Sequence, residues 1–284
     1  MRINHNISSM IGQGSLANQQ ASLTKSLEKL STGLRINRAS DDAAGLSVSE
    51  SLRAKVRGME RAKSNAADGI ALIQIAEGAT GEINNILQRM RELSIQSATD
   101  TMTTTERSYT DKEFSNLMSE ITRISNSASY NGMTLLDGGS NSFGVSGGQA
   151  SVLHIGAGSN ASVDRLSITM NSMTLGALGL NQASTSVSSS TLALSALSLI
   201  DTAIKSVNTM RSDMGAYVNR LEFAISNLSN QIYNTQDAES RIRDVDFAKE
   251  TTEFTRSQIL VQSATSMLSQ ANNVPQGVLS LLSG

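Results

Sequence analysis

Residues able to carry catalytic or metal chemistry are few and scattered in this sequence. It holds two histidines, His5 and His154, and no cysteine. A metal site needs several Cys, His or carboxylate ligands, and a nucleophilic triad needs a base beside its nucleophile. Histidines in two unrelated segments supply neither arrangement. We therefore expect that the protein is not an enzyme, with no catalytic residues, no metal and no cofactor.

Adjacent carboxylates at Asp41 and Asp42 are the pair best placed for acid–base chemistry. They lie in a turn-rich stretch, residues 33–47, together with Arg35 and Arg38. Carboxylates in such a stretch commonly cap helices or pair with nearby cations. We interpret both as structural groups in a connector between helices.

Composition and charge narrow the class of protein further. The formal net charge is −2 and no strongly basic block occurs, which argues against a nucleic-acid partner. No apolar run reaches the ~18 residues of a membrane span, so we expect no membrane partner. Aromatic residues make up only 3% and Pro275 is the single proline. This balance favours long helices packed along narrow seams.

Both ends of the chain predict uncharged helices that pair. No charged side chain occurs from Ile3 to Thr24 or from Ser257 to Gly284. Apolar residues recur there about every 3.5 positions, the spacing that lets helices pack side by side. We expect this seam to be buried against the other end and against further copies. The predicted filament-core seam comprises Ile3, Ile7, Met10, Leu23, Leu27, Leu30, Leu260, Ala264, Met267, Ala271, Val274, Val278 and Leu281.

Between the ends, the pattern predicts long helices over about 45–98 and 191–235, with a shorter helix ending near 128. At about 1.5 Å per residue, the first of these would span roughly 80 Å. Helices of this length are typical of an extended bundle. The predicted rod seam comprises Leu72, Ile83, Ile86, Met90, Ile204, Val207, Val218, Leu221, Ile225 and Leu228.

Local signals mark several helix ends. Ser47 with Glu50 and Thr103 with Glu106 form capping-box patterns at two predicted helix starts. Gly33 predicts the end of the first helix, which we place over about 3–33.

The middle of the chain changes character. Asn131-Gly132 predicts a tight turn. Glycines then separate short alternating segments around Leu153 and Leu166, which predict half-buried β-hairpins. The expected fold class is mainly α: a long-helix coiled-coil bundle rod with paired terminal helices and a small β-hairpin region mid-chain. The expected domains are 1–42 with 243–284 (terminal helices), 43–135 with 190–242 (long-helix rod), and 136–189 (a small, outward-facing β-rich insert).

Long stretches on both sides of this middle region resemble bacterial flagellin. The resemblance covers about residues 1–140 and 190–284, and the short middle departs from large flagellins, which carry extra outer domains there. The stretches that carry it are SLEKLSTGLRINRASDDAAGLSVSESLR (26–53), NAADGIALIQIAEGATGEINNILQRMREL (65–93), YNGMTLLDG (130–138), RLEFAISNL (220–228), SRIRDVDFAKE (240–250) and QANNVPQGVLSLL (270–282).

The resemblance implies a structural subunit that polymerises with itself into the hollow helical flagellar filament, the propeller for motility. In the family, the paired termini line the filament core and the long helices form an outer tube. It further implies type III export, since the N-terminal residues lack the features of a signal peptide. A secreted, extracellular filament is the expected location. The implied partners are a flagellar export chaperone at the C-terminal segment, and the filament cap and hook-junction proteins.

Two surface roles also follow from the resemblance. In flagellins with the LQRMREL motif, Toll-like receptor 5 recognises a surface that corresponds here to Arg89, Leu93 and Glu113. That innate receptor is a candidate partner, and a subunit contact is the alternative. Exposed hydroxyls of some flagellins are O-glycosylated, and an unmodified loop is the alternative here. The candidate positions are Ser184, Thr185, Ser186, Ser188, Ser189, Ser190 and Thr191.

Two other functions share parts of the pattern. A hook–filament junction protein, or another exported axial component, would carry similar terminal seams. A free coiled-coil scaffold or type III translocator would form small soluble oligomers. The segment at 240–250 and the unbroken match across both halves favour the filament subunit.

Overall fold

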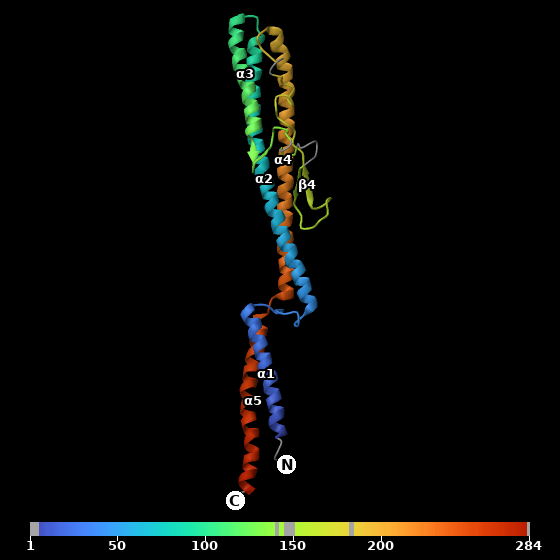
Figure 1. Cartoon of the computed structure of the whole chain (residues 1–284), viewed down its shortest axis with the longest axis vertical. Helices are drawn as coiled ribbons and strands as arrows, with labels where there is room; N and C mark the ends of the chain where they lie inside the picture. Colours follow the sequence, from blue (N-terminus) through green and yellow to red (C-terminus); the bar gives the residue numbers. More distant parts are fainter. Residues whose placement is uncertain (1–5, 140–141, 145–150, 182–184, 283–284) are drawn as a thin grey trace. The chain divides into compact units, whose positions relative to one another are not determined.

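The computed structural model describes residues 6–139, 142–144, 151–181 and 185–282, with side chains as far as Asn273 in the last helix. Helices dominate it, in agreement with the mainly α prediction (Figure 1). The elements in chain order are α1 (Ile7–Thr32), α2 (Ala43–Ala98), α3 (Thr104–Ser127), β1 (Ser129–Tyr130), β2 (Met133–Thr134), β3 (Ser151–His154), β4 (Arg165–Ile168), α4 (Ser190–Arg243) and α5 (Phe247–Leu282).

The chain packs as two compact units. Unit 1 is Met1–Lys55 with Tyr233–Gly284, and unit 2 is Val56–Ile232. The unit boundaries therefore fall inside α2 and α4, whereas the predicted domain boundaries fall at 42/43 and 242/243, where helices begin or end. The difference has a physical cause, because the first turns of α2 and the last turns of α4 are joined by ion pairs within unit 1.

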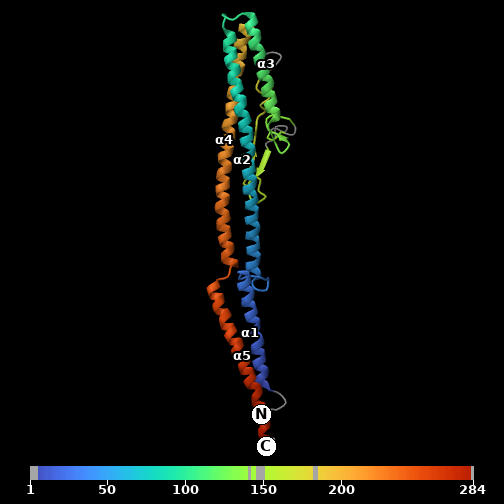
Figure 2. The same ribbon diagram turned by 90° about the vertical axis from the view of Figure 1, so that its left-hand side faces the viewer.

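Unit 1 is built on an antiparallel pair of helices, α1 and α5 (Figure 2). The start of α1 meets the end of α5, where the Asn6 side-chain amide donates to the Ala271 carbonyl at 2.8 Å. At the opposite end of the pair, Lys29 forms an ion pair with Glu250 at 3.5 Å. Segments more than two hundred residues apart in sequence thus lie side by side, as the paired-ends prediction required.

Unit 2 has a continuous apolar core between α2, α3 and α4. Fully buried side chains include Ile83 and Met90 on α2, Phe114 on α3, and Ile200 and Val207 on α4. At the surface of this bundle, Arg91 of α2 pairs with Asp201 of α4 at 2.7 Å. The apolar positions recur at helical spacing on each element, which places one face of each helix in the core.

Described residues of the segment predicted as an outward-facing insert, 136–189, contribute to this same core. Leu166 and Ile168 of β4 are buried, and further along Leu180 and Val187 are fully buried. β3 pairs with β4 antiparallel, with Leu153 opposite Leu166. Gly69 of α2 allows this close approach, because a Cβ there would stand 2.4 Å from Leu153. The insert therefore packs on the helices instead of forming a separate domain.

Most predicted helix ends and turns are confirmed. Gly33 ends α1 with φ 72°, in the left-handed region. Thr103 and Glu106 form a full capping box at α3. Asn131 and Gly132 both have positive φ, at 49° and 78°, in the two-residue turn between β1 and β2.

Two predicted ends were wrong. α2 begins at Ala43, and Asp42 accepts a hydrogen bond from the Gly45 amide at 2.8 Å, so Asp42 caps this helix instead of Ser47. α4 continues to Arg243 instead of ending near 235. Its final turns are held in unit 1 by ion pairs that the local pattern does not reveal.

One helix among the described residues, α4, is long and apolar enough to cross a membrane by length and composition alone. From the sequence we expected no membrane span, because no uninterrupted apolar run reaches about 18 residues. Ala193, Ile200 and Val207 on this helix are buried in the unit 2 core. The same apolar residues thus serve to pack α4 against the bundle.

Replacing Ile83 by Ala should destabilise the protein by about 2–5 kcal/mol, because this fully buried side chain leaves a cavity in the unit 2 core. The matched control is Ile75→Ala, at a position on the same helix that is 43% exposed. It should cost less than about 1 kcal/mol. Urea unfolding followed by circular dichroism measures both. Equal losses in the two variants would contradict this placement of the core.

Candidate assembly interface

The face joining α1 to α5 is a narrow seam of small and medium side chains. From α1, Leu16, Leu23 and Leu30 are half-buried at a spacing of seven residues. From α5, Val261 and Leu268 are half-buried at the same spacing. This is the heptad arrangement of a two-helix coiled coil. This seam covers only one face of α1 and one face of α5.

The predicted filament-core seam divides between this face and the exposed surface. Leu23, Leu30, Ala264 and Ala271 lie on the seam between α1 and α5. Others are exposed: Ile7 at 54%, Met10 at 66%, Leu27 at 52%, Leu260 at 44% and Met267 at 70%. Ile3 and the side chains of Val274, Val278 and Leu281 lie outside the described residues.

The reason is geometric. The predicted and observed tracks on α5 share Ala264 and Ala271 and differ at alternate positions. α1 packs against Val261 and Leu268, whereas the prediction placed Leu260 and Met267, each one residue earlier, on the seam. A shift of one residue turns a side chain about 100° around a helix. Two apolar tracks with the same repeat therefore lie next to each other on α5, and periodicity alone cannot tell which one faces α1.

Exposed apolar side chains gather on the parts of α1 and α5 that do not face each other. We call Ile7, Met10 and Ile11 of α1, with Ile259, Leu260 and Met267 of α5, the outward face; each is at least 44% exposed. An open hollow of about 480 Å³ lies on α5 between Thr252, Arg256 and Leu260, and its walls are mainly apolar. We did not predict the hollow or the exposure of Ile11 and Ile259. The absence of charged residues from 3–24 and 257–284 was the available signal for the two isoleucines.

Unit 1 has almost no apolar core of its own. Among the residues described in it, Ile36 is the only apolar side chain that is fully buried, at 2% exposed. Among the side chains described on the paired helices, the buried positions are Ser26 and Ser257. A helix pair without a core is marginal in water, because helical stability in proteins comes mainly from packing an apolar face. The single chain therefore leaves this unit incomplete.

The predicted rod-seam residues all lie in unit 2 and contribute to its packing. Leu72, Ile83, Met90, Val207 and Leu221 are buried in the main core. Ile86, Ile204, Val218 and Ile225 are half-buried against it, and Leu228 lies in a smaller cluster with Val56 and Met59. Within a single chain these side chains are already covered by their own bundle.

The two charged connectors are bonded to each other. Leu34 and Asp244 form an antiparallel bridge, and the Val245 amide donates to the Gly33 carbonyl at 3.0 Å. The Arg35 guanidinium donates to the Ile242 carbonyl. These bonds join residues more than two hundred positions apart. They explain why both connectors are rich in turn formers and charges.

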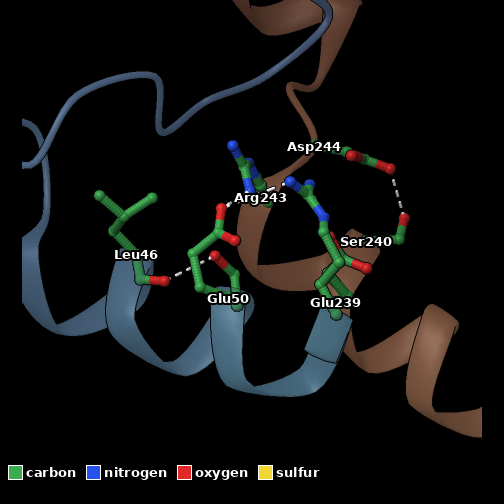
Figure 3. Close-up of polar contacts among 8 residues, drawn as sticks. Leu46, Glu50, Glu239, Ser240, Arg243 and Asp244 are labelled. Carbon is green, nitrogen blue, oxygen red and sulfur yellow. Dashed lines mark hydrogen bonds and ion pairs between the residues drawn. The ribbon is translucent and has the colours of Figure 1, made fainter. Parts of the chain in front are cut away.

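Ion pairs fix the adjoining helix turns (Figure 3). Arg243 of α4 binds Glu50 of α2 at 2.6 Å, and its side chain is only 12% exposed. Arg53 contacts both Glu50, at 3.3 Å, and Glu239, at 2.8 Å. A shared carboxylate between two guanidinium groups is geometrically restrictive. It holds the start of α2 and the end of α4 together in unit 1.

Asp41 has a structural role, as expected, but its partner differs from the arginines proposed. Lys25 of α1 lies 2.8 Å from its carboxylate. The hydrogen bond from Lys25, aided by the backbone amide of Arg38, lowers the pKa of Asp41 to about 2. Arg38 instead pairs with Glu28 at 2.9 Å.

The candidate receptor surface is only partly exposed. Arg89 binds Glu113 of α3 at 2.9 Å, and both side chains are about half exposed. This bond raises the pKa of Arg89. Leu93, however, is 1% exposed and belongs to the unit 2 core, so its placement on the surface was wrong. It faces the bundle because it follows Met90 and Ile86 on the apolar face of α2.

The candidate O-glycosylation positions differ in how far their side chains are exposed to solvent. Ser184 lies outside the described residues. Thr185 is 3% exposed, which corrects its placement in an open loop. Ser186 donates to Asp111 at 2.8 Å, Ser189 is half-buried, and Ser190 donates to the Ala98 carbonyl at 2.8 Å. Only Ser188 and Thr191 are exposed, because fully buried Val187 draws the segment against the bundle.

Comparison with known proteins identifies the family. Residues 3–141 match the bacterial flagellin N-terminal helical region, and residues 197–282 match the bacterial flagellin C-terminal helical region. The chain belongs to the bacterial flagellin family. A flagellin is a structural subunit of the flagellar filament, so the uncovered outward face belongs to a protein that assembles with copies of itself.

Relatives of similar length support this assignment. The flagellin is 45% identical to the flagellar filament 33 kDa core protein of Treponema phagedenis, over 99% of this chain and all of that protein. It is 42% identical to the flagellin of Bacillus subtilis (strain 168), again over 99% of this chain and all of the relative. These matches favour the filament subunit over the junction-protein alternative.

A structural comparison agrees at the level of fold. A candidate flagellar hook-associated protein from Vibrio parahaemolyticus aligns over 72% of this flagellin and all of its own chain, with a TM-score of 0.58. The two are 17% identical, so the likeness shows a shared fold alone.

Replacing Asp41 by Asn should lower the melting temperature above about pH 4, and the difference from wild type should shrink as the pH falls toward 2. The folded pKa of about 2 lies below the ~3.9 of an unfolded aspartate, so the charged form stabilises the fold above that range. Thermal melts between pH 2 and 7 test this. Asp213→Asn, at an exposed position on α4, is the matched control. A difference that does not change with pH would contradict the role given to Lys25.

Proposed function

We propose that this flagellin polymerises by burying the outward face of α1 and α5 against neighbouring copies. The observation that carries the proposal is the missing core of unit 1, where Ile36 is the only fully buried apolar side chain among the described residues. Neighbouring copies supply the apolar contacts that the single chain lacks. The unit 2 bundle, by contrast, has its own core and needs no partner to cover it.

The energies make this assembly cooperative. Ordering a residue costs about 1–2 kcal/mol of conformational entropy. Fully burying a large apolar side chain contributes about 1.5–3 kcal/mol. One helix pair with a thin seam cannot offset its ordering cost, whereas several copies burying the outward face together can. Polymerisation is therefore steeply dependent on concentration and on a preformed nucleus.

The chemistry of the outward face suits another copy of the same chain. The segments 3–24 and 257–284 carry no charge, so their close packing leaves no charged group to desolvate. We expect the hollow beside Ile259 and Leu260 to receive an apolar side chain from a neighbour, with the aliphatic part of Arg256 at its edge. Heterologous contacts between copies generate a helical polymer when the rotation from one copy to the next does not close into a ring.

Further partners belong to the same proposal. An export chaperone would bind the C-terminal segment, whose apolar outward face supports such a contact inside the cell. The filament cap and hook-junction proteins would meet the ends of the polymer through the same terminal helices. We place the filament outside the cell, reached by type III export. Should O-glycosylation occur, exposed Ser188 and Thr191 are its best sites.

Recognition by Toll-like receptor 5 is a separate proposal. It rests on Arg89 and Glu113, which stand exposed and paired on the surface of the bundle. Leu93 supports that surface from beneath, since it is buried. No described residue of unit 1 takes part, so this recognition does not depend on polymerisation.

Replacing Ile259 and Leu260 together by Ser should abolish seeded polymerisation while leaving the helical content of the chain unchanged, because both side chains are exposed in the single chain. Electron microscopy and sedimentation after seeding with short wild-type filaments measure this. The matched control is Phe223→Ser, which removes a 75% exposed apolar side chain from unit 2. Normal growth of the Ile259/Leu260 variant would contradict the proposal.

Replacing Arg89 by Ala should raise the protein concentration needed for half-maximal receptor signalling about tenfold, because it removes the centre of the exposed charged pair. A receptor-reporter assay with monomeric protein measures the response. Arg123→Ala is the control, since it breaks a similar exposed pair with Glu120 on α3. An unchanged response to the Arg89 variant, or an equal loss in the control, would remove the proposal.

A further inference from the structure

The described methionines of this flagellin differ widely in exposure. The chain has no cysteine, so its twelve methionines hold all of its sulfur. Most described methionines are buried at 2% exposure or less: Met59, Met90, Met118, Met170, Met173, Met210 and Met214. Met10 and Met267 stand apart, at 66% and 70% exposed.

Both of these methionines belong to the outward face, near the contact between Gly12 and Leu268. Gly12 of α1 faces Leu268 of α5, where an added Cβ would stand 3.4 Å from the leucine. Met10 precedes Gly12 by two residues and Met267 precedes Leu268 by one. Because the helices are antiparallel, the two methionines lie on opposite sides of this contact, about 4.5 Å apart along the helix axes at 1.5 Å per residue. Both lie in the uncharged part of the pair.

We propose that Met10 and Met267 form an oxidation-sensitive site that controls polymerisation. The inference rests on the proposed function, because it takes the outward face as the surface that neighbouring copies bury. The reagent is a two-electron oxidant of the peroxide class. Methionine oxidation depends on access to the sulfur, so the two exposed thioethers react first.

The step is an oxygen transfer. A sulfur lone pair attacks one oxygen of hydrogen peroxide, the S–O bond forms and the O–O bond breaks. The sulfur is oxidised to the sulfoxide, and the second oxygen takes up the remaining proton and leaves as water. Reduction of the sulfoxide restores the thioether, so the modification is reversible.

The product changes the chemistry of the outward face. A thioether is apolar and adaptable, and it suits an irregular packing surface. A sulfoxide carries a strong acceptor oxygen, which loses its hydrogen bonds to water when neighbouring copies bury the outward face. Each unsatisfied group of this kind raises the monomer concentration required for growth about tenfold. Oxidation thus keeps the chain monomeric, and assembly in turn shields both sulfurs.

The first experiment uses full-length monomer and hydrogen peroxide, with peptide mass spectrometry after the oxidant is removed. Met10 and Met267 should gain one oxygen each before any of the seven buried methionines does. Seeded growth should then be lost. Equal oxidation rates at Met10, Met267 and the buried methionines would contradict the proposed oxidation-sensitive site.

The second experiment uses a Met10→Leu, Met267→Leu double variant. Leucine keeps the volume and apolar character, so polymerisation without peroxide should match wild type, and growth after peroxide should persist. The control is Met133→Leu, at a 37% exposed position on β2 in unit 2; it should remain as sensitive as wild type. A double variant that polymerises yet still loses growth after peroxide would overturn the proposal.

A third measurement separates this inference from the proposed function. Assembled filaments are treated with the same peroxide, and oxidation at Met10 and Met267 is compared with the monomer. Slower oxidation of Met10 and Met267 in the filament than in the monomer supports both the proposed function and this inference. Equal oxidation in filament and monomer would overturn burial of the outward face and the control of assembly by these sulfurs. The preference for these two sulfurs in the monomer would still stand.

Discussion

The structure depends on one constraint: the terminal helices cannot bury their apolar side chains within a single chain. α1 and α5 meet along a thin seam whose buried positions, among the described side chains, are Ser26 and Ser257. Ile7, Met10, Ile259 and Met267 remain in water. Exposed apolar surface of this kind marks an interaction site. Because α1 and α5 bury little apolar surface within one chain, that surface is available for contacts between copies.

Unit 2 and the connectors are stabilised in different ways from the poorly packed α1–α5 pair. Unit 2 closes its own core with three helices and the mid-chain segment, so the middle of the chain is stable without neighbours. The connectors use polar bonds instead, since Arg243, Glu50 and Arg53 share ion pairs where little apolar surface is available. A flagellin thereby combines a self-sufficient bundle with ends completed only by copies of itself.

The sequence predicted elements well where the signal was local. A capping box at Thr103, a left-handed glycine at Gly33 and an Asn-Gly turn at 131–132 each depend on a few adjacent residues. Predictions failed where partners were distant. α4 extends to Arg243 because Glu50 and Arg53 hold its last turns, and Leu93 faces inward because α3 and α4 cover it. Nothing in the sequence near Arg243 reveals Glu50 and Arg53 as its partners. For Leu93 the helical spacing from Ile86 and Met90 was an available local signal.

The sequence by itself determined the family, the helical character, the pairing of the two ends and the lack of charge along them. These follow from periodicity and composition, which act within a segment. Only the tertiary structure decided which of two adjacent tracks on α5 faces α1, and therefore that Leu260 and Met267 stand outward. Both tracks repeat every 3.5 residues. The choice depends on contacts with a helix more than two hundred residues away.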